Sequence, residues 1–280
     1  MDLRRADMHT HTNCSDGERS PTELVRKAGE YGLAALAITD HDTIEGLPEA
    51  FAAGVEYGVE VVSGVELSVT VGDREIHLLG YFFDPAHAGL REYLASYRER
   101  RRERGLAMVE RLQALGVPLR FEAVLEQSGD GVIGRPHVAR ALHDGGHVET
   151  YVDAFDRYLA DGGPAFVAKE PFPAEQALDL LHEAGGIGAI AHPGHWTATE
   201  VLMTLIRMGL DGIETIHPSH DAMLTDYYRQ IARDFLLLET GGSDYHGFRE
   251  QDEENFGHVS IPYPRFDRAR RRARMGMLTT

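Results

Sequence analysis

Short apolar runs alternate with amphipathic segments along most of this 280-residue chain, and nearly every run ends in a histidine or a carboxylate. The alternation predicts βα units around a largely parallel sheet. We expect strands at residues 3–9, 34–39, 59–67, 75–82, 187–192, 212–216 and 235–240. We expect helices at residues 21–31, 46–57, 174–185, 199–208 and 221–233. Seven strands with intervening helices predict a closed or nearly closed α/β barrel.

The alternation stops between about residues 85 and 170, where the chain becomes charged and helix-periodic. We therefore expect a barrel formed by residues 1–84 and 171–280, and a helical insertion, residues 85–170, that forms a lid over the site. The arginine-rich run RERRRER at 98–104 could bind a phosphate, but such runs are typically solvated helix faces, and we expect one here.

The composition of the chain limits which classes of partner it can bind. The chain has 45 acidic against 28 basic residues, a formal charge of −17, which disfavours binding to duplex DNA. No uncharged apolar run reaches the length of a membrane span, and the single cysteine, Cys14, suits a reducing compartment. We expect a cytoplasmic protein without membrane contact, with no obligate protein partner evident from the sequence.

The first expected strand ends in two histidines one residue apart. Because successive strand side chains point to opposite faces, His9 and His11 share one face. Asp16 follows in a loop that Gly17 allows to turn sharply. In α/β barrels the carboxyl ends of the strands carry the chemistry. Two histidines one residue apart are a weak indication of a metal site when taken alone. Their position at the carboxyl end of a barrel strand is, however, where such a site would lie.

The same residue types recur at the ends of the other expected strands. They are Asp40, His41, Asp42, Glu66, His77, His192, His217, Asp244 and His246. Carboxylates buried together without cations would repel one another and lose their hydration. Bound divalent cations remove that cost, so the pattern predicts a metal centre at one rim of the barrel.

The motifs DMHTHTNCSDG, ITDHDT, GVELS, HLLGY, AHPG and GGSDYHG together resemble the PHP (polymerase and histidinol phosphatase) family of metal-dependent phosphoesterases. The inserted VIGRPHVARAL and the later GGIGAIAHPG are most similar to the subgroup of 3′,5′-nucleoside bisphosphate phosphatases. This resemblance implies a distorted (β/α)7 barrel with a helical insertion and a site for three metal ions.

The resemblance also implies the ligand sets. The first metal would be bound by His9, His11, Glu66 and Asp244. The second would share Glu66 and add His77 and His192. The third would take Asp16, His41 and His246. Donor sets rich in imidazole suit Mn, Fe or Zn better than Mg or Ca, and Mn is our first choice because relatives use it. We expect Asp7 and Asp40 to orient histidines, and Cys14 to be a bystander.

Two cations about 4 Å apart can hold a bridging hydroxide that attacks phosphorus. We count Glu66, Asp244, Arg135 and His217 as candidate catalytic residues. Arg135 is the candidate phosphate fork, because a guanidinium matches phosphate geometry, and we expect it to project from the lid toward the metals. His217 is a candidate to bind phosphate or protonate the leaving oxygen. His195 is a third candidate substrate contact, at a position where some relatives have arginine.

The leading hypothesis is a phosphatase that removes the 3′-phosphate of nucleoside 3′,5′-bisphosphates such as pAp. Its substrate would be a small phosphorylated nucleotide or a short oligonucleotide. A 5′→3′ exonuclease on short 5′-phosphorylated RNA and a histidinol phosphatase are alternatives with the same metal core. An amidohydrolase is disfavoured, because neither lysine, Lys27 or Lys169, falls in an expected strand where it could bridge metals. A non-enzymatic PHP module that stabilises a polymerase is the remaining alternative.

Overall fold

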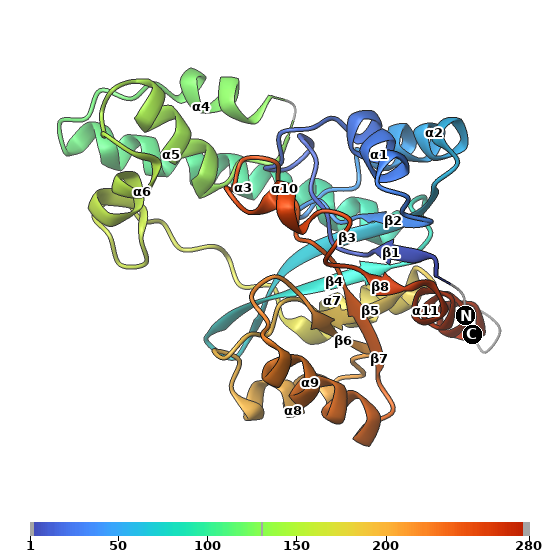
Figure 1. Ribbon diagram of the computed structural model, residues 1–280. Helices are drawn as coiled ribbons and strands as arrows, with labels where there is room; N and C mark the ends of the chain where they lie inside the picture. Colours follow the sequence, from blue (N-terminus) through green and yellow to red (C-terminus); the bar gives the residue numbers. More distant parts are fainter. Residues whose placement is uncertain (1–2, 130, 277–280) are drawn as a thin grey trace.

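The computed structural model describes residues 3–129 and 131–276, and it confirms the expected α/β barrel. Eight strands of this described part form one sheet in the order β7-β6-β5-β4-β3-β2-β1-β8 (Figure 1). They are β1 (Arg5–Asp7), β2 (Ala35–Ile38), β3 (Glu60–Val71), β4 (Arg74–Tyr81), β5 (Ile187–Ile190), β6 (Gly212–Ile216), β7 (Leu238–Gly241) and β8 (Ile261–Pro262). The two-residue β8 pairs antiparallel with β1 and is too short to leave a periodic signal in the sequence.

The segments that follow β1 and β7 bring the two sides of the sheet together. The amide of His11 donates to the carbonyl of Tyr245 at 2.9 Å, and the amide of Asp244 donates to the carbonyl of His9 at 2.9 Å. Several of the backbone bonds that draw the barrel nearly closed therefore involve residues that the sequence singled out as metal ligands.

Besides the short β8, β4 is the strand of the described sheet that runs opposite to the others. β4 runs antiparallel to both β3 and β5, whereas β1, β2 and β3 are mutually parallel, as are β5, β6 and β7. A two-residue turn, with Gly72 at φ +59°, joins β3 to β4 as a hairpin. Because β4 is reversed, His77 near its start lies at the same rim as the carboxyl ends of the parallel strands, paired in register with Ser68.

Helices cover the outside of the barrel. They are α1 (Pro21–Glu30), α2 (Leu47–Tyr57), α7 (Ala174–Glu183), α8 (Thr199–Arg207), α9 (Ala222–Asp234), α10 (Asp252–Asn255) and α11 (Tyr263–Gly276). A capping box of Ser20 and Glu23 starts α1. Leu181 of α7 packs so closely on β4 that a Cβ at Gly80 would lie 2.4 Å from its methyl group. This close packing holds the rim residues on a rigid support.

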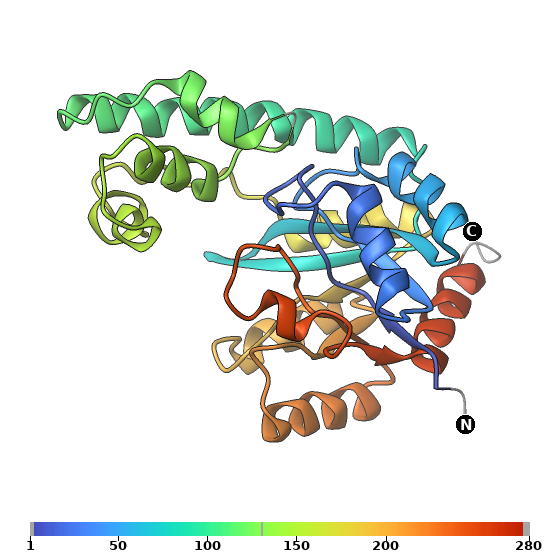
Figure 2. The ribbon, with the colours of Figure 1, turned by 45° about the horizontal axis from the view of Figure 1, so that its top comes forward.

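A second group of helices stands to one side of the barrel (Figures 1 and 2). It contains α3 (Ala88–Ala114), α4 (Phe121–Ser128), α5 (Arg135–Asp144), α6 (Tyr151–Ala154) and the π-helical turn η1 (Phe155–Leu159). The first half of α3 joins the barrel core through Leu90 and Leu94. Its second half carries Met108 and Leu112 into a separate hydrophobic cluster shared with α4 and α5. The long helix α3 therefore connects this group to the barrel.

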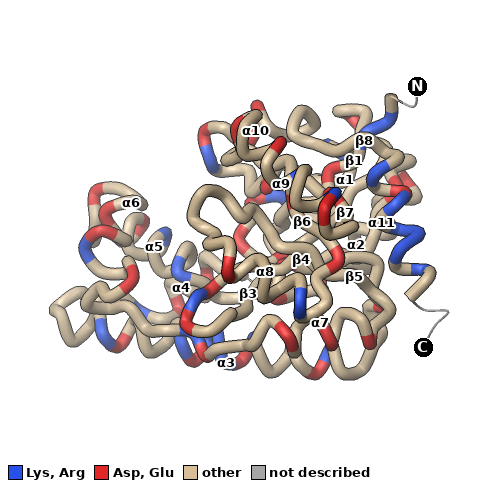
Figure 3. Tube along the Cα trace, turned by 90° about the horizontal axis from the view of Figure 1, so that it is seen from below, with Lys and Arg blue, Asp and Glu red and all other residues tan. Residues whose placement is uncertain are grey.

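Basic residues gather along α3 and α11, while acidic residues are spread over the chain, including α3 (Figure 3). Across the described residues, no helix combines the length and the apolar composition that a bilayer crossing would need. The uneven distribution of positive charge, rather than the net charge of −17, sets the electrostatics near the rim.

Candidate metal centre

The rim of the barrel gathers nine histidines and carboxylates from both ends of the chain. Glu66 lies in the middle of β3 and His77 in the reversed β4, and the others lie in the segments that follow β1, β2, β5 and β7. These residues are His9, His11, Asp16, His41, Glu66, His77, His192, Asp244 and His246. The structure thus brings together all nine side chains that the sequence proposed as ligands.

Glu66 is the centre of the arrangement. It is fully buried in β3, and its two oxygens lie 2.9–3.2 Å from ring nitrogens of five histidines: His9, His11, His41, His77 and His192. Burial alone would raise the pKa of Glu66, but the surrounding histidines, chiefly His41 and His9, hold that pKa well below its usual range. Glu66 is therefore ionised, and its two oxygens face different groups of imidazoles, as a carboxylate shared by two cations requires.

Sets of potential ligand atoms lie within 4.8 Å of one another. One set is His9, His11, Glu66 and Asp244, the same four residues assigned to the first metal. Another is His11, Asp16, His41 and His246, which contains the three residues assigned to the third metal. For the proposed second metal, His77 and His192 both approach Oε1 of Glu66, each at 2.9 Å.

The unsatisfied atoms of these side chains fit divalent cations. Both ring nitrogens of His11 and Nδ1 of His41 are buried and, within the described residues, have no partner with hydrogen-bond geometry. Buried polar atoms normally have partners, so these nitrogens have room for another ligand. Imidazole and carboxylate donors together suit Mn, Fe or Zn.

Glu214 of β6 is a site residue that the sequence analysis missed. It is fully buried, with Oε1 3.0 Å from Nδ1 of His9 and Oε2 accepting the amide of His192 at 2.6 Å. When Nδ1 of His9 donates to this carboxylate, Nε2 is free to face Glu66. The only signal was a single acid within the otherwise uncharged strand GIETI, which does not distinguish an inward from an outward side chain.

Asp7 and Asp40 hold loops in place, which corrects the expectation that they orient imidazole rings. Asp7 accepts from the amide and hydroxyl of Ser243 at 3.0 and 2.6 Å, and from the amide of His9 at 3.2 Å. Asp40 accepts from the amide and hydroxyl of Thr12, both at 2.7 Å, and from the hydroxyl of Ser15. Both carboxylates fix the backbone next to the proposed ligands rather than the rings themselves.

Two proposed ligands have strained backbones. His192 has a φ of +26° and Asp244 a φ of +51°, both unusual for residues with a Cβ. Such conformations cost about 1–3 kcal/mol each and persist where the surroundings enforce them. Arg249 helps to hold Asp244, because its Nη1 donates to Oδ2 at 2.7 Å. The strain lies at the rim, where the side chains converge.

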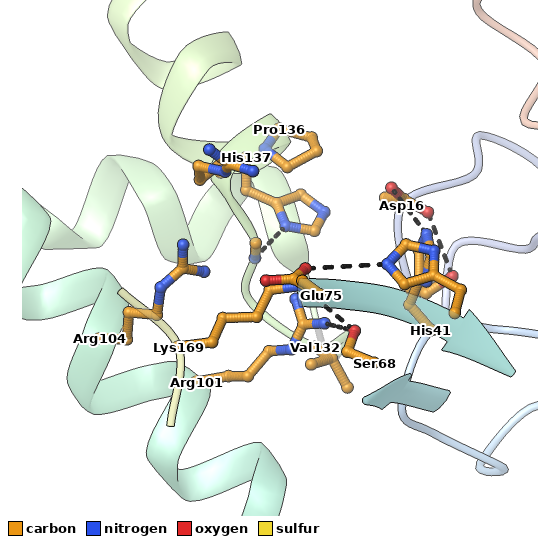
Figure 4. A pocket seen from close by; sticks show the side chains of 14 residues that line it. Asp16, His41, Ser68, Glu75, Arg101, Arg104, Val132, Pro136, His137 and Lys169 are labelled. Atoms are coloured by element: carbon orange, nitrogen blue, oxygen red, sulfur yellow. Dashed lines mark hydrogen bonds and ion pairs between the residues drawn. The ribbon is translucent and has the colours of Figure 1, made fainter. Parts of the chain in front are cut away.

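A cavity of about 160 Å³ opens beside the rim (Figure 4). Asp16, His41 and His77 border it on the side of the proposed metals. Four cations also line it: Arg101, Arg104, Arg135 and Lys169. We call these four residues the cation wall.

Arg101 and Arg104 belong to the run 98–104, which the sequence analysis expected to be a solvated helix face. That expectation was wrong for these two residues, since each is only 8% exposed. They lie one helical turn apart on the buried face of α3, while Arg102 between them is exposed. The sequence of an arginine run does not show which of its residues lie on the buried face of the helix, because that depends on what the helix packs against.

The three residues proposed to contact substrate have different surroundings. Arg135 starts α5 and lines the cavity, but its Nη1 donates to Asp161 at 2.5 Å rather than to the rim. Nε2 of His217 lies 3.5 Å from Oδ2 of Asp244, next to the rim. His195 is exposed and lies outside the lining of the cavity. Their roles stay predictions.

Comparison with known proteins agrees with this geometry. The family model of the PHP domain matches residues 7–161. A 5′-3′ exoribonuclease of Haemophilus influenzae is 35% identical over 249 residues, which is 87% of this chain and 90% of that protein. A 3′,5′-nucleoside bisphosphate phosphatase of Chromobacterium violaceum is 35% identical over 250 residues, 87% of this chain and 88% of the relative. A crystal structure from Bifidobacterium adolescentis, assigned as a metal-dependent phosphoesterase, superposes with a TM-score of 0.86 at 31% identity, covering 95% of this chain and 96% of that one.

The chain therefore belongs to the PHP family, and it is a metal-dependent hydrolase of phosphoric esters. This confirms the family and the class of reaction that the motifs predicted. It also makes the non-enzymatic module the weakest of the alternatives.

The contact between Glu214 and His9 predicts an effect on metal affinity. Glu214→Gln keeps the volume of the side chain but removes the charge that fixes the His9 ring, and second ligand shells of this kind typically contribute 10–100-fold to affinity. We expect Mn²⁺ to bind about 10–100-fold more weakly in a chelator-competition titration. The matched control is Glu239→Gln on β7, whose carboxylate pairs with Arg229 and Arg265 instead of a histidine. Equal Mn²⁺ affinity in the two variants would contradict the role given to Glu214.

Proposed function

We propose that the chain removes the 3′-phosphate from nucleoside 3′,5′-bisphosphates such as pAp, which gives the nucleoside 5′-monophosphate and inorganic phosphate. The observation that carries the proposal is the cavity between the rim and the cation wall. A nucleoside bisphosphate has two phosphates separated by a ribose. The reacting 3′-phosphate would lie at the rim, and the 5′-phosphate would lie against the cations.

The proposed centre has three divalent cations, with Mn the first choice and Fe or Zn as alternatives. The ligand sets are His9, His11, Glu66 and Asp244; Glu66, His77 and His192; and Asp16, His41 and His246. When bound, such cations supply a water of near-neutral pKa as nucleophile and neutralise charge on the phosphoryl oxygens. Glu66 and Asp244 would hold the cations in place, and Glu214 fixes the ring of His9, a further ligand in the first set.

Arg104 is the residue of the cation wall whose positive charge is least balanced by neighbouring carboxylates. Its Nε donates to the carbonyl of Val167 at 2.7 Å, and among the described residues no carboxylate forms an ion pair with it. Burial, together with the neighbouring charges of Arg101 and Arg135, lowers the pKa of Arg104 to about 10. An anion in the cavity would relieve this repulsion, and a phosphate is the anion that guanidinium groups match best.

Other residues complete the proposed reaction. His217, 3.5 Å from Asp244, is placed to bind a phosphoryl oxygen or to protonate the leaving 3′ oxygen. Arg135 contributes to the cavity wall and would reorient from Asp161 when a phosphate binds. His195 is exposed on the loop after β5, where it would reach only a part of the substrate outside the cavity.

The second candidate is 5′→3′ exonuclease action on short 5′-phosphorylated RNA, supported by the name of the Haemophilus influenzae relative. The cation wall would hold the 5′-phosphate in the same way, and the reacting phosphate would be a diester. Histidinol phosphatase is disfavoured, because histidinol phosphate has one phosphate and a positively charged amine that the cation wall would repel.

The direct test is phosphate release by the Mn-loaded chain. We expect pAp to be hydrolysed with a kcat/KM at least 100-fold above that for histidinol phosphate, because only pAp places a second phosphate on the cations. Turnover of 5′-phosphorylated RNAs of two to five nucleotides distinguishes the two candidates: turnover that increases with length favours the exonuclease. Absence of hydrolysis of both pAp and the oligonucleotides would refute the proposal.

The cation wall predicts a loss of substrate affinity when Arg104 is replaced. A hydrogen bond to a charged group contributes about 1.5–3 kcal/mol, which corresponds to roughly 10- to 150-fold. We expect Arg104→Met to raise the KM for pAp by at least 10-fold with a smaller change in kcat. Arg102→Met is the control, because Arg102 is exposed on the same helix and its Nη1 lies 3.7 Å from Glu99. Equal KM values in the two variants would exclude Arg104 from the phosphate site.

A further inference from the structure

Asp42 is a buried carboxylate that the proposed reaction does not yet use. It follows His41 in the loop after β2, is fully buried, and has a φ of +53°. Its oxygens accept from the amide and the hydroxyl of Ser68 at 2.8 and 2.9 Å. A strained backbone on a non-glycine residue is kept where its surroundings enforce it, and often at functional sites. The strain at Asp42 therefore points to a function for its carboxylate.

Arg101 reaches Asp42 from α3. Nη2 of Arg101 donates to Oδ2 of Asp42 and, at 3.0 Å, to the hydroxyl of Ser68. The same hydroxyl accepts from Nζ of Lys169 at 3.2 Å. The side chains of Arg101 and Asp42 are both buried, so their ion pair is largely kept from solvent. Arg101 and Lys169, two members of the cation wall, thus both reach the Ser68 hydroxyl. Arg101 is anchored by Asp42, whereas Lys169 also pairs with Glu75 of β4, which lines the same cavity.

The anchor matters because Arg101 and Lys169 have open space on two sides. They line the 160 Å³ cavity at the rim and also a second cavity of about 260 Å³ between α3 and residues 167–170. Side chains that separate two cavities are not held by close packing alone. Their position depends on polar contacts, and for Arg101 those contacts are Asp42 and Ser68.

One arm of the Arg101 guanidinium lies toward the rim cavity. Its Nη1 lies beside Gly134, 3.5 Å from where a Cβ would be, and Gly134 lines the cavity. Nη2 is fixed by Asp42 and Ser68, so Nη1 is the nitrogen placed to meet an anion. An arginine held in this way binds phosphate with little loss of side-chain freedom.

We propose that Asp42 is a positioning residue for substrate: it fixes the Arg101 fork so that the non-reacting phosphate of a nucleotide binds in the cavity. This inference rests on the proposed function, because it assumes a substrate with a second phosphate. It assigns Asp42 a role in selecting substrates with that phosphate, without contact to the reacting atoms.

The first test measures binding without turnover. Adenosine 5′-monophosphate, the product of the proposed reaction, is titrated into the Mn-loaded protein by isothermal titration calorimetry. Asp42→Asn weakens its binding at least 10-fold, because Asn cannot hold Arg101 by charge. The matched control is Asp211→Asn, since Asp211 is also a largely buried aspartate but accepts from the amide of Gly188, on β5, and contacts His182. No binding by the wild type, or equal binding by the two variants, would overturn the inference.

The second test separates positioning from general structural support. The ratio of kcat/KM for pAp to that for adenosine 3′-monophosphate falls at least 10-fold in Asp42→Asn and stays constant in Asp211→Asn. A purely structural role would lower both rates equally and leave the ratio unchanged, which would overturn the inference. Absence of activity on pAp in the wild type would instead refute the proposed function, while the binding test still decides the role of Asp42.

Arg101→Lys covers the case in which Asp42→Asn does not fold. Lysine keeps the positive charge beside Asp42 but cannot offer a second nitrogen to a phosphate. We expect at least a 10-fold weaker binding of adenosine 5′-monophosphate, with circular dichroism like that of the wild type. Unchanged affinity in this folded variant would show that the fork does not bind the phosphate, and would overturn the inference.

Discussion

The structure depends on one electrostatic constraint: Glu66 is buried at the barrel rim with five imidazole rings around its two oxygens. These rings come from β4 and from the segments that follow β1, β2 and β5, and Asp244 and His246 join them from the segment after β7, at the far end of the sheet. The complete site therefore forms only if the barrel closes. Closure in turn uses backbone bonds of His9, His11 and Asp244. The fold and the proposed metal centre are therefore one arrangement. The strained backbone of Asp244 is held by its closure bond to His9, and that of His192 by the bond from its amide to Glu214.

The net charge of −17 and an anionic substrate are compatible because the charges are separated in space. The rim concentrates carboxylates that cations would neutralise, while the cation wall faces them across the cavity. A substrate with two phosphates meets positive charge at both ends once metals are bound. Under the proposed function, the chain would discriminate by the distance between phosphates, which a general basic surface could not do.

Much of the barrel and the rim followed from the sequence, because strand ends and ligand types leave local signals. His9 and His11 share a face by simple alternation, and Ser20 marks a helix start. The predictions that were wrong or missing concern residues whose roles depend on contacts with residues distant in sequence. Arg101 and Arg104 look like a solvated run until α3 is packed against the segment around Lys169. Glu214 is an isolated acid whose role exists only because β6 places it against His9. Asp40 turned out to hold a loop, since proximity to a histidine in sequence does not decide which group a carboxylate contacts.

The most direct test of the central claim is anomalous X-ray diffraction from crystals grown with Mn²⁺. The account predicts three manganese peaks at the rim, one within each of the three ligand sets, with Glu66 shared by two of them. A rim without manganese at saturating concentration, or manganese bound by other side chains while these histidines and carboxylates stay unliganded, would contradict it.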